Sequence, residues 1–329
     1  MRILNKQDVQ KLFSMQDAFE AVREASIRHI TGEDTVPPRV HLKSDALPFE
    51  SLVMPGLIEG RFFGLKVWYE LAAARGELPR SSAFLQIMDL VDGSQALLEA
   101  STITDFRTGA MTGLVAERVF RAESPQQLGI IGTGVQARTQ ILAVLHAFPA
   151  LRTVLVFARN AQKLSSFVAD MTAEISAIAG LGDVELIAAE SAEEACRGSR
   201  IVIAATSSSE PVIFKDWIDT DHALVVSIGS HAPADRELDP EIVVEADAII
   251  VDTVLGSVDN AGDIGPLLAE GRVSRNRIQT IGEAMLSEQE FKGLTILKTV
   301  GFAAADLYSA KRVLLKNKLA QLGYEVDFY

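Results

Sequence analysis

The sequence has a single cysteine, Cys196, among its 329 residues. One cysteine forms neither an intramolecular disulfide nor a thiolate metal cage, so both kinds of scaffold are excluded. The surrounding segment "EEACRGSR" is typical of a helix end, and we interpret the thiol as inert. An H-E-x-x-H motif and clusters of histidine and acidic residues at ligand spacing are also missing, so we expect no metal ion.

The chain also lacks basic blocks and long hydrophobic runs. Acidic residues outnumber basic ones by 44 to 31, which gives a formal net charge of −13. Because binding to a nucleic-acid backbone depends on clustered lysine and arginine, we expect no nucleic-acid partner. A membrane span needs about 20 apolar residues, whereas the most apolar window, residues 141–158, is interrupted by His146, Pro149 and Arg152. The N-terminus has no signal-peptide pattern, so we expect a cytoplasmic protein with no membrane partner.

The apolar pattern changes after Pro125. From there, apolar runs alternate with helical or loop segments, as in a parallel sheet with helices on both faces. The runs are "QLGII", "TVLVFA", "VELIAA", "RIVIAATS", "ALVVSIG", "AIIVD" and "LTILKTVG", and an amphipathic helix is expected at 302–322. We predict an α/β fold with a Rossmann-type doubly wound sheet, and the chain length favours a second domain.

The first part of the chain mixes α and β patterns. Residues 14–30 have apolar side chains at helical spacing, with Ser14 as the expected N-cap. The segments "FFGLKVWYE" and "AFLQIMDL" are typical of strands, and the Asp-Gly pair at 92–93 predicts a hairpin turn. A helix is expected to begin at Thr104 or Asp105.

The stretch "GTGVQA", residues 132–137, fits the pattern G-x-G-x-x-[G/A] between an expected strand and an expected helix. In such a turn Gly132 allows the tight bend, Gly134 lets the backbone approach a pyrophosphate, and Ala137 allows close packing of helix and strand. The free N–H groups at the helix N-terminus favour phosphate. The setting predicts a dinucleotide-binding loop.

The end of the next strand, "TVLVFARN", bears on the choice of cofactor. An NAD enzyme usually carries Asp or Glu there, whereas this strand ends in Arg159 and Asn160. An arginine pairs with a 2′-phosphate and stacks on adenine. We therefore predict that NADP(H) is preferred and that NAD(H) is possible. The alternative is that Arg159 is a solvated loop residue and that both cofactors are accepted.

Three of the basic residues before the glycine-rich turn stand in positions that suggest a function. Arg39 follows a proline pair in "VPPRVHL", Lys66 lies inside the apolar strand, and Arg107 opens the helix "FRTGAMTGL". A lysine inside an apolar strand is either an edge-strand feature or a buried functional cation. Three cations that converge on a carboxylate would favour the second explanation, because arginine binds carboxylates bidentately.

The sequence resembles the ornithine cyclodeaminase/μ-crystallin family over nearly its whole length. The segments that carry the resemblance, in the family's order, are "VPPRVHL", "GLKV", "TDFRTGA", "GTGVQAR", "SIGSHAPADRELD", "AGDI" and "KTVGFAAADL". The resemblance implies a homodimer. It also implies an α+β substrate-binding and dimerisation domain built from residues 1–115 and 305–329, and a Rossmann NAD(P)-binding domain at 116–304.

Matched motif by motif, the resemblance implies a substrate site at Arg39, Lys66 and Arg107. Arg107 would clamp the carboxylate, and Lys66 would hold the carboxylate or relay a proton to the substrate nitrogen. The further cofactor residues that it implies are Ser81, Thr133, Val135, Gln136, Thr206 and Thr299. Of these, Ser81, Thr206 and Thr299 are expected at the nicotinamide end, unless they are ordinary strand-end residues.

One position departs from the cyclodeaminase pattern. Those enzymes carry an Asp, which handles the side-chain amine, where this sequence has His231. A desolvated ammonium group needs a negative partner, and removing one typically costs ~3–5 kcal/mol. The histidine therefore argues against ornithine cyclisation. It is either a general acid/base near neutral pH or a residue that shapes the pocket.

Our main hypothesis is an NAD(P)H-dependent reductase of small 2-imino acids, such as cyclic ketimine carboxylates. Three alternatives stay open. The first is an NAD(P)-dependent amino-acid dehydrogenase, for instance on alanine. The second is an ornithine cyclodeaminase that releases ammonia. The third is a protein that binds NADPH without turnover, since a fold does not fix a function.

Overall fold

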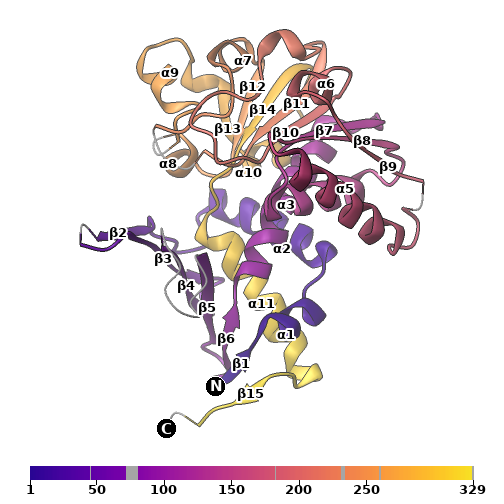
Figure 1. Ribbon diagram of the computed structural model, residues 1–329. Coiled ribbons are helices and arrows are strands. Elements are labelled where there is room, and N and C mark those ends of the chain that lie inside the picture. The colour runs from indigo at the N-terminus through magenta and orange to yellow at the C-terminus, as the bar shows by residue number, and fades with distance from the viewer. Residues whose placement is uncertain (45, 72–80, 182, 231–233, 259–260, 328–329) are drawn as a thin grey trace. The chain divides into compact units, whose positions relative to one another are not determined.

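The computed structural model describes residues 1–44, 46–71, 81–181, 183–230, 234–258 and 261–327. The chain forms two compact units (Figure 1). Unit 1 comprises Met1–Arg107 with Phe302–Tyr329, and unit 2 comprises Thr108–Gly301. The chain leaves unit 1 within helix α3 (Ser101–Val119) and returns to it after Gly301.

Unit 1 contains a seven-stranded sheet that joins both ends of the chain. Its strand order is β15-β1-β6-β5-β4-β3-β2. The strands are β1 (Arg2–Leu4), β2 (Val40–Ser44), β3 (Phe49–Ile58), β4 (Phe62–Leu71), β5 (Ser81–Asp89), β6 (Gln95–Glu99) and β15 (Tyr324–Glu325). Strand β1 pairs in parallel with β6 and antiparallel with β15. Strands β5 and β6 pair antiparallel around Gly93, whose φ is 73°, which confirms the predicted hairpin.

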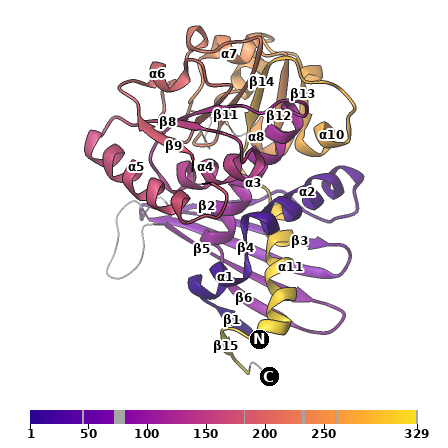
Figure 2. The same cartoon turned by 90° about the vertical axis from the view of Figure 1, so that its right-hand side faces the viewer.

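Among the described residues, three helices belong wholly to unit 1, namely α1 (Lys6–Leu12), α2 (Met15–Thr31) and α11 (Ala303–Ala320). Helix α11 packs against β3 to β6 and lies across these strands in Figure 2, whereas α2 packs on α11. Ser14 accepts a hydrogen bond from the N–H of Asp17 and caps α2, as predicted. None of the helices in the described ranges is long and apolar enough to cross a membrane.

Helix α11 approaches the sheet closely at a pair of glycines. Gly56 and Gly64 face each other across β3 and β4. A Cβ atom on either glycine would lie only 2.7 or 2.8 Å from a methyl group of Leu307. The bare backbone therefore allows Leu307 to rest on the sheet, and this contact sets the position of its neighbour Asp306.

Helix α3 begins at Ser101, so the expected start at Thr104 or Asp105 was wrong. The carboxylate of Glu99 accepts hydrogen bonds from the backbone N–H groups of Ser101 and Thr102, at 2.7 and 3.2 Å. An acceptor that precedes the helix satisfies the free N–H groups of its first turn. Such a cap lies outside the usual Ser, Thr, Asp or Asn pattern.

Unit 2 contains an eight-stranded parallel sheet in the order β13-β12-β14-β11-β10-β7-β8-β9. The strands are β7 (Gln127–Ile131), β8 (Thr153–Phe157), β9 (Glu185–Ala188), β10 (Ile201–Ala204), β11 (His222–Ser227), β12 (Ala248–Val251), β13 (Ile278–Thr280) and β14 (Gly293–Lys298). The helices are α4 (Val135–Ala147), α5 (Ala161–Ser176), α6 (Ala192–Cys196), α7 (Pro240–Glu245), α8 (Val254–Ser257), α9 (Gly265–Ala269), α10 (Ile281–Leu286), η1 (Lys215–Trp217) and η2 (Arg275–Arg277).

The strand order of unit 2 confirms the predicted Rossmann-type sheet. Strand β7 lies between β8, the next strand in the sequence, and β10. The order therefore reverses at β7, and in open parallel sheets ligands bind beyond the carboxyl ends of the strands at such a point. The strands there are buried on both faces, as the continuous Val and Ile runs predicted.

Candidate active site

The turn from β7 to α4 needs glycine at its first position. Gly132 has a φ of 122°, in the region that favours glycine. A Cβ atom there would lie 2.3 Å from the carbonyl oxygen of Ala205. The N–H of Gly132 donates to the carbonyl of Phe157 at 2.8 Å, which ties the turn to the end of β8. The fold itself therefore requires this glycine.

Gly134 differs, because the fold does not require a glycine there. It is the N-cap of α4, with φ −85° and ψ −179°, a conformation open to any residue. A Cβ atom would have no other atom within 4 Å. The space in front of the α4 N-terminus is open, and its free N–H groups favour an anion. The arrangement fits the pyrophosphate of a dinucleotide.

The other predicted loop residues surround this space. Thr133 and Gln136 are half-buried, and Val135 is 61% exposed. Ala137 is fully buried where α4 packs on the sheet, as expected for the third small position. These positions agree with a phosphate loop, while their individual contacts to a cofactor stay predictions.

Arg159 and Asn160 have different roles at the end of β8. The side chain of Asn160 accepts a hydrogen bond from the N–H of Lys163 at 2.9 Å and caps α5. Arg159 is exposed, and within the described ranges no hydrogen bond or ion pair engages its guanidinium. A cation in this state is available to a phosphate group.

Thr206 follows the end of β10 and is held by a carboxylate, Glu237, that sequence reasoning missed. Oε1 of Glu237 accepts hydrogen bonds from the N–H and Oγ1 of Thr206, at 2.7 and 2.8 Å. Oε2 accepts from the N–H groups of Ile228 and Gly229, at 3.0 and 2.6 Å, and from Oγ of Ser227 at 2.9 Å. Glu237 thus fastens the ends of β10 and β11 together.

A buried lysine and a second carboxylate complete this network. Lys298, at the end of β14, lies 3.0 Å from Oγ of Ser227 and 3.3 Å from the carboxylate of Asp263. Asp263 also accepts a hydrogen bond from the N–H of Glu237 at 2.9 Å. Lys298 and Glu237 are 0% exposed, and burial raises the pKa of Glu237 above its ordinary value. The sequence signal was a charged residue inside each of "DREL", "AGDI" and "KTVG".

Thr299 follows Lys298 at the same edge of the sheet. Its N–H donates to the carbonyl of Ser227 at 3.3 Å, and its side chain is 1% exposed. Within the described ranges, Oγ1 has no hydrogen-bond partner. Thr206 and Thr299 therefore follow the two strands that flank β11, and the unsatisfied hydroxyl of Thr299 fits a site that binds a polar group.

In unit 1 the structure joins Lys66 and Arg107 through Asp306. One oxygen of Asp306, Oδ1, lies 2.8 Å from Nζ of Lys66 and 3.1 Å from Nε of Arg107. Lys66 is 2% exposed and β4 lies between β3 and β5, so the edge-strand explanation was wrong. Asp306, on the first turn of α11, was not assigned from the sequence. Its signal was a lone carboxylate in the apolar segment "FAAADL".

The surroundings of this cluster bring the pKa of Lys66 closer to neutral pH. Burial lowers the pKa of Lys66 to about 8, with Asp306 opposing the fall and Arg107 adding to it. Burial acts to raise the pKa of Asp306, but Arg107 and Lys66 together hold that pKa below its ordinary value. Burial and then Glu99 raise the pKa of Asp105 to about 6. When Lys66 is protonated, the three bonded residues Lys66, Arg107 and Asp306 together carry one positive charge.

Of the remaining predicted residues, two lie at the starts of strands in unit 1 and one is not described. Arg39 is half-buried just before β2, and its role in binding a carboxylate stays a prediction. Ser81, the first residue of β5, accepts a hydrogen bond from the indole N–H of Trp68 at 3.0 Å. His231 lies outside the described residues.

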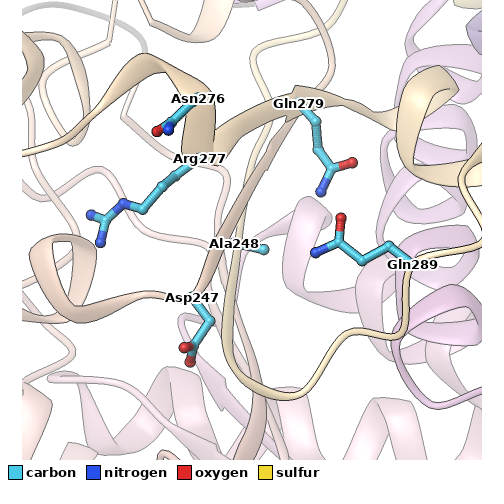
Figure 3. A pocket seen from close by; sticks show the side chains of 6 residues that line it. All are labelled: Asp247, Ala248, Asn276, Arg277, Gln279 and Gln289. Atoms are coloured by element: carbon cyan, nitrogen blue, oxygen red, sulfur yellow. The ribbon is translucent and has the colours of Figure 1, made fainter.

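Unit 2 also contains a polar pocket of about 200 Å³, on the side of the parallel sheet away from the carboxyl ends of its strands (Figure 3). Its lining residues are Asp247, Ala248, Asn276, Arg277, Gln279 and Gln289. They cluster at the amino ends of β12 and β13, whereas Rossmann ligands bind at the carboxyl ends. The pocket is therefore not the dinucleotide site. In the described part of the chain, no group of three or more His, Cys, Asp and Glu residues is placed to hold a metal.

Comparison with known proteins agrees with this geometry. The model of the ornithine cyclodeaminase/mu-crystallin family matches residues 1–319. The structure of Thermococcus litoralis Δ1-pyrroline-2-carboxylate reductase with NADH and L-proline is 30% identical, with 99% of this chain and 100% of that chain covered and a TM-score of 0.87.

Two further relatives are alanine dehydrogenases. The enzyme of Archaeoglobus fulgidus is 28% identical, with 99% of this chain and 98% of its own length covered. The structure of an archaeal alanine dehydrogenase dimer with bound NAD is 26% identical, with 100% and 99% covered and a TM-score of 0.87. The predicted enzyme class, an NAD(P)-dependent oxidoreductase of imino or amino groups, is confirmed. Because the family model spans residues 1–319, the chain belongs to the ornithine cyclodeaminase/mu-crystallin family.

Proposed function

We propose that this chain reduces small 2-imino acids with NAD(P)H, by hydride transfer to the carbon of a C=N bond. Cyclic ketimine carboxylates such as Δ1-pyrroline-2-carboxylate are the proposed substrates. The observation that carries the proposal is the buried cluster of Lys66, Arg107 and Asp306. It combines a surplus positive charge with a lysine whose pKa is about 8.

Arg107 is the proposed binding group for the substrate carboxylate. Its Nε donates to Asp306, and within the described ranges its two terminal nitrogens make no hydrogen bond. A guanidinium presents its donors as a rigid fork that matches a carboxylate. The side chain is 6% exposed, so a carboxylate bound there is shielded from water and interacts more strongly.

Lys66 is the proposed donor of the proton that imine reduction consumes. The overall reaction takes up one hydride and one proton, and gives an amine and the oxidised cofactor. Lys66 in its cationic form transfers a proton to the imine nitrogen, which makes the neighbouring carbon more electrophilic. The lysine then regains a proton from solvent. A group with a pKa near the working pH is an efficient donor, and such catalysis contributes about 10²–10⁴-fold.

The N-terminus of α4 is the proposed pyrophosphate site, with Gly132, Thr133, Gly134, Val135 and Gln136 around it. The bound nicotinamide supplies the hydride. We assign Thr206 and Thr299 to the nicotinamide end, because they follow the two strands that flank β11. Arg159 supports a preference for NADP(H) through a 2′-phosphate. NAD(H) stays possible, because two related structures contain NADH or NAD.

We also propose a homodimer formed through unit 1. Helices α1, α2 and α11 lie on one side of its sheet (Figure 1). Alternate residues of β2 to β5 form the other side, which we call the outer face. Its apolar members include Val40, Val53, Phe63, Leu65, Val67, Phe84 and Met88. Phe63 and Phe84 are 40% and 41% exposed. An apolar face of this kind marks an interaction surface, and a related structure is a dimer.

An amino-acid dehydrogenase is the second candidate, favoured by the similarity to the alanine dehydrogenase of Archaeoglobus fulgidus. The same residues would clamp the carboxylate of a 2-oxo acid, and ammonia would supply the nitrogen. An ornithine cyclodeaminase is disfavoured because His231 stands where that activity needs an Asp.

The deciding experiment follows the loss of reduced-nicotinamide absorbance in purified protein. Cyclic imino acids are supplied without amine, and pyruvate is supplied with and without ammonium. Oxidation of NADPH or NADH by the cyclic imines alone is the expected result. Oxidation that needs both pyruvate and ammonium would replace the proposal with the dehydrogenase. Release of ammonia from ornithine without net oxidation would replace it with the cyclodeaminase, and cofactor binding without any turnover would contradict all three.

A further inference from the structure

We propose that Asp306 is a positioning residue, which holds Lys66 as a cation and directs the terminal nitrogens of Arg107 toward the substrate. The inference rests on the proposed function for the identity of the substrate. Its structural basis is one oxygen, Oδ1, that binds Nζ of Lys66 at 2.8 Å and Nε of Arg107 at 3.1 Å. The three residues are far apart in the sequence, and Asp306 on α11 joins the other two.

The bonding of Asp306 is unlike that of a structural carboxylate in the same unit. Asp89 is equally buried, and both of its oxygens are used. Its Oδ1 accepts from Arg61 and from the N–H of Val91, at 2.8 and 3.1 Å, and its Oδ2 accepts from Arg61 at 2.7 Å. In contrast, Oδ2 of Asp306 is buried and has no hydrogen-bond partner in the described ranges.

This difference is informative because buried polar atoms are nearly always satisfied, and an unsatisfied one calls for an explanation. A pair built for stability would use both oxygens and balance its charges, since desolvation opposes a buried ion pair. Asp306 instead shares one oxygen between two cations. The cluster keeps a positive charge and an uncommitted acceptor, both of which suit a bound imino acid with a carboxylate and an N–H group.

The nitrogen of Arg107 that binds Asp306 determines which nitrogens remain for the substrate. Asp306 takes Nε, the inner nitrogen of the guanidinium, and leaves the two terminal nitrogens. Those two form the fork that binds a carboxylate through parallel hydrogen bonds. A change of one methylene at position 306 would therefore rotate the fork as well as shift the lysine.

The groups that act on Lys66 come from three sides. Asp306 faces it from α11, and Arg107 and Asp105 act on it from α3. Its cross-strand neighbours on β3 and β5 are Met54 and Leu85, which carry no charge. Asp306 is thus the principal source of negative potential at the lysine. Its removal leaves burial and Arg107, which favour the neutral amine, against the smaller opposing effect of Asp105.

The test compares Asp306→Asn with Asp89→Asn. Carbon-13-labelled lysine is titrated by NMR in both variants and the wild type, and the Lys66 signal is assigned by its loss in Lys66→Met. We expect Asp306→Asn to lower the pKa of Lys66 by about 1–3 units. The alkaline limit of imine reduction should move down by the same amount. Asp89→Asn should leave both unchanged, because its carboxylate serves Arg61 and Lys318.

Asp306→Glu is the second variant, and it keeps the charge balance if Asp306→Asn does not fold. We expect a Lys66 pKa close to that of the wild type and a kcat/KM about tenfold lower, mainly through KM, because Arg107 is displaced. An unshifted Lys66 in Asp306→Asn, or wild-type KM and kcat in Asp306→Glu, would overturn the inference. The NMR titration needs no turnover, so an inactive wild type would refute the proposed function and still decide the coupling of Asp306 to Lys66.

Discussion

Lys66 is a single side chain whose charge changes within the ordinary range of pH. Its pKa of about 8 lies well below the usual lysine value because it is buried in an apolar strand. The cation is the form that gives up a proton, and it predominates below that pKa. A reaction that needs this proton is therefore fast below about pH 8 and slows as pH rises through it.

We expect kcat/KM for imine reduction to fall about tenfold for each pH unit above the pKa of Lys66. Below that pKa, Lys66→Met should lower the rate by about 10²–10⁴-fold, since the proton donor is lost. The difference between variant and wild type should shrink as pH rises above it. Steady-state rates across the pH range measure both effects. Cofactor affinity, followed by fluorescence titration, should not change. A Lys66→Met enzyme with the wild-type pH profile would show that another group donates the proton.

Arg159 allows an equally local prediction. Arg159→Ala removes the exposed cation at the end of β8, and we expect the ratio of kcat/KM for NADPH to that for NADH to fall by about 10–100-fold. The estimate reflects a charge-assisted hydrogen bond worth ~1.5–3 kcal/mol. Arg152, an exposed arginine just before the start of the same strand, is the matched control. Arg152→Ala should leave the ratio unchanged, and an equal fall in both variants would mean a general effect of surface charge.

At the scale of elements, the loop between β7 and α4 separates Gly132, which the fold requires, from Gly134, which we propose for cofactor binding. Gly132 has a positive φ and no room for a Cβ atom, whereas Gly134 has an ordinary backbone and open space. Alanine should therefore disturb folding at position 132 and leave it unchanged at position 134.

We expect Gly132→Ala to be strongly destabilised, because the clash with the Ala205 carbonyl adds to an unfavourable backbone conformation. Gly134→Ala should keep the wild-type midpoint in urea denaturation. Its affinity for the cofactor should fall about tenfold or more, because the added methyl group occupies the space of the pyrophosphate. Calorimetric titration with NADPH measures this. Wild-type affinity in Gly134→Ala would argue against a phosphate site at the α4 N-terminus.

Local patterns predicted elements better than they predicted the site. Ser14 and the turn at Gly93 were identified correctly because capping and hairpin signals lie within a few residues. The start of α3 was wrong because its cap comes from the side chain of Glu99. The loop at 132–137 was recognisable because its glycines and its helix are adjacent in the sequence.

Long-range partners explain what sequence reasoning missed. Asp306 is 240 residues from Lys66, and nothing in its own segment indicates which cation it binds. Glu237 likewise binds the backbone of Thr206, which lies 31 residues away in the sequence, just beyond β10. Lys66 had two explanations in the sequence, and only the position of β4 between two strands decided between them.

At the scale of the whole molecule, the outer face of unit 1 predicts self-association. We expect Phe84→Glu to convert a dimer to a monomer, because burying a carboxylate in an apolar interface is costly. Sedimentation velocity measures the change. Leu319→Glu is the control, since Leu319 is 92% exposed at the end of α11 and lies off the outer face. A Phe84→Glu protein that sediments like the wild type would place any dimer contact elsewhere.

The three residues of the ion cluster are synthesised at different times, because they lie far apart in the sequence. Lys66 and Arg107 are synthesised early, yet their counter-ion belongs to α11, near the end of the chain. Residues 108–301 come between and form a complete unit of their own. Since domains fold as they emerge, unit 2 can be finished while the two cations still lack a partner. We expect unit 1 to fold last, when Asp306 neutralises part of their charge.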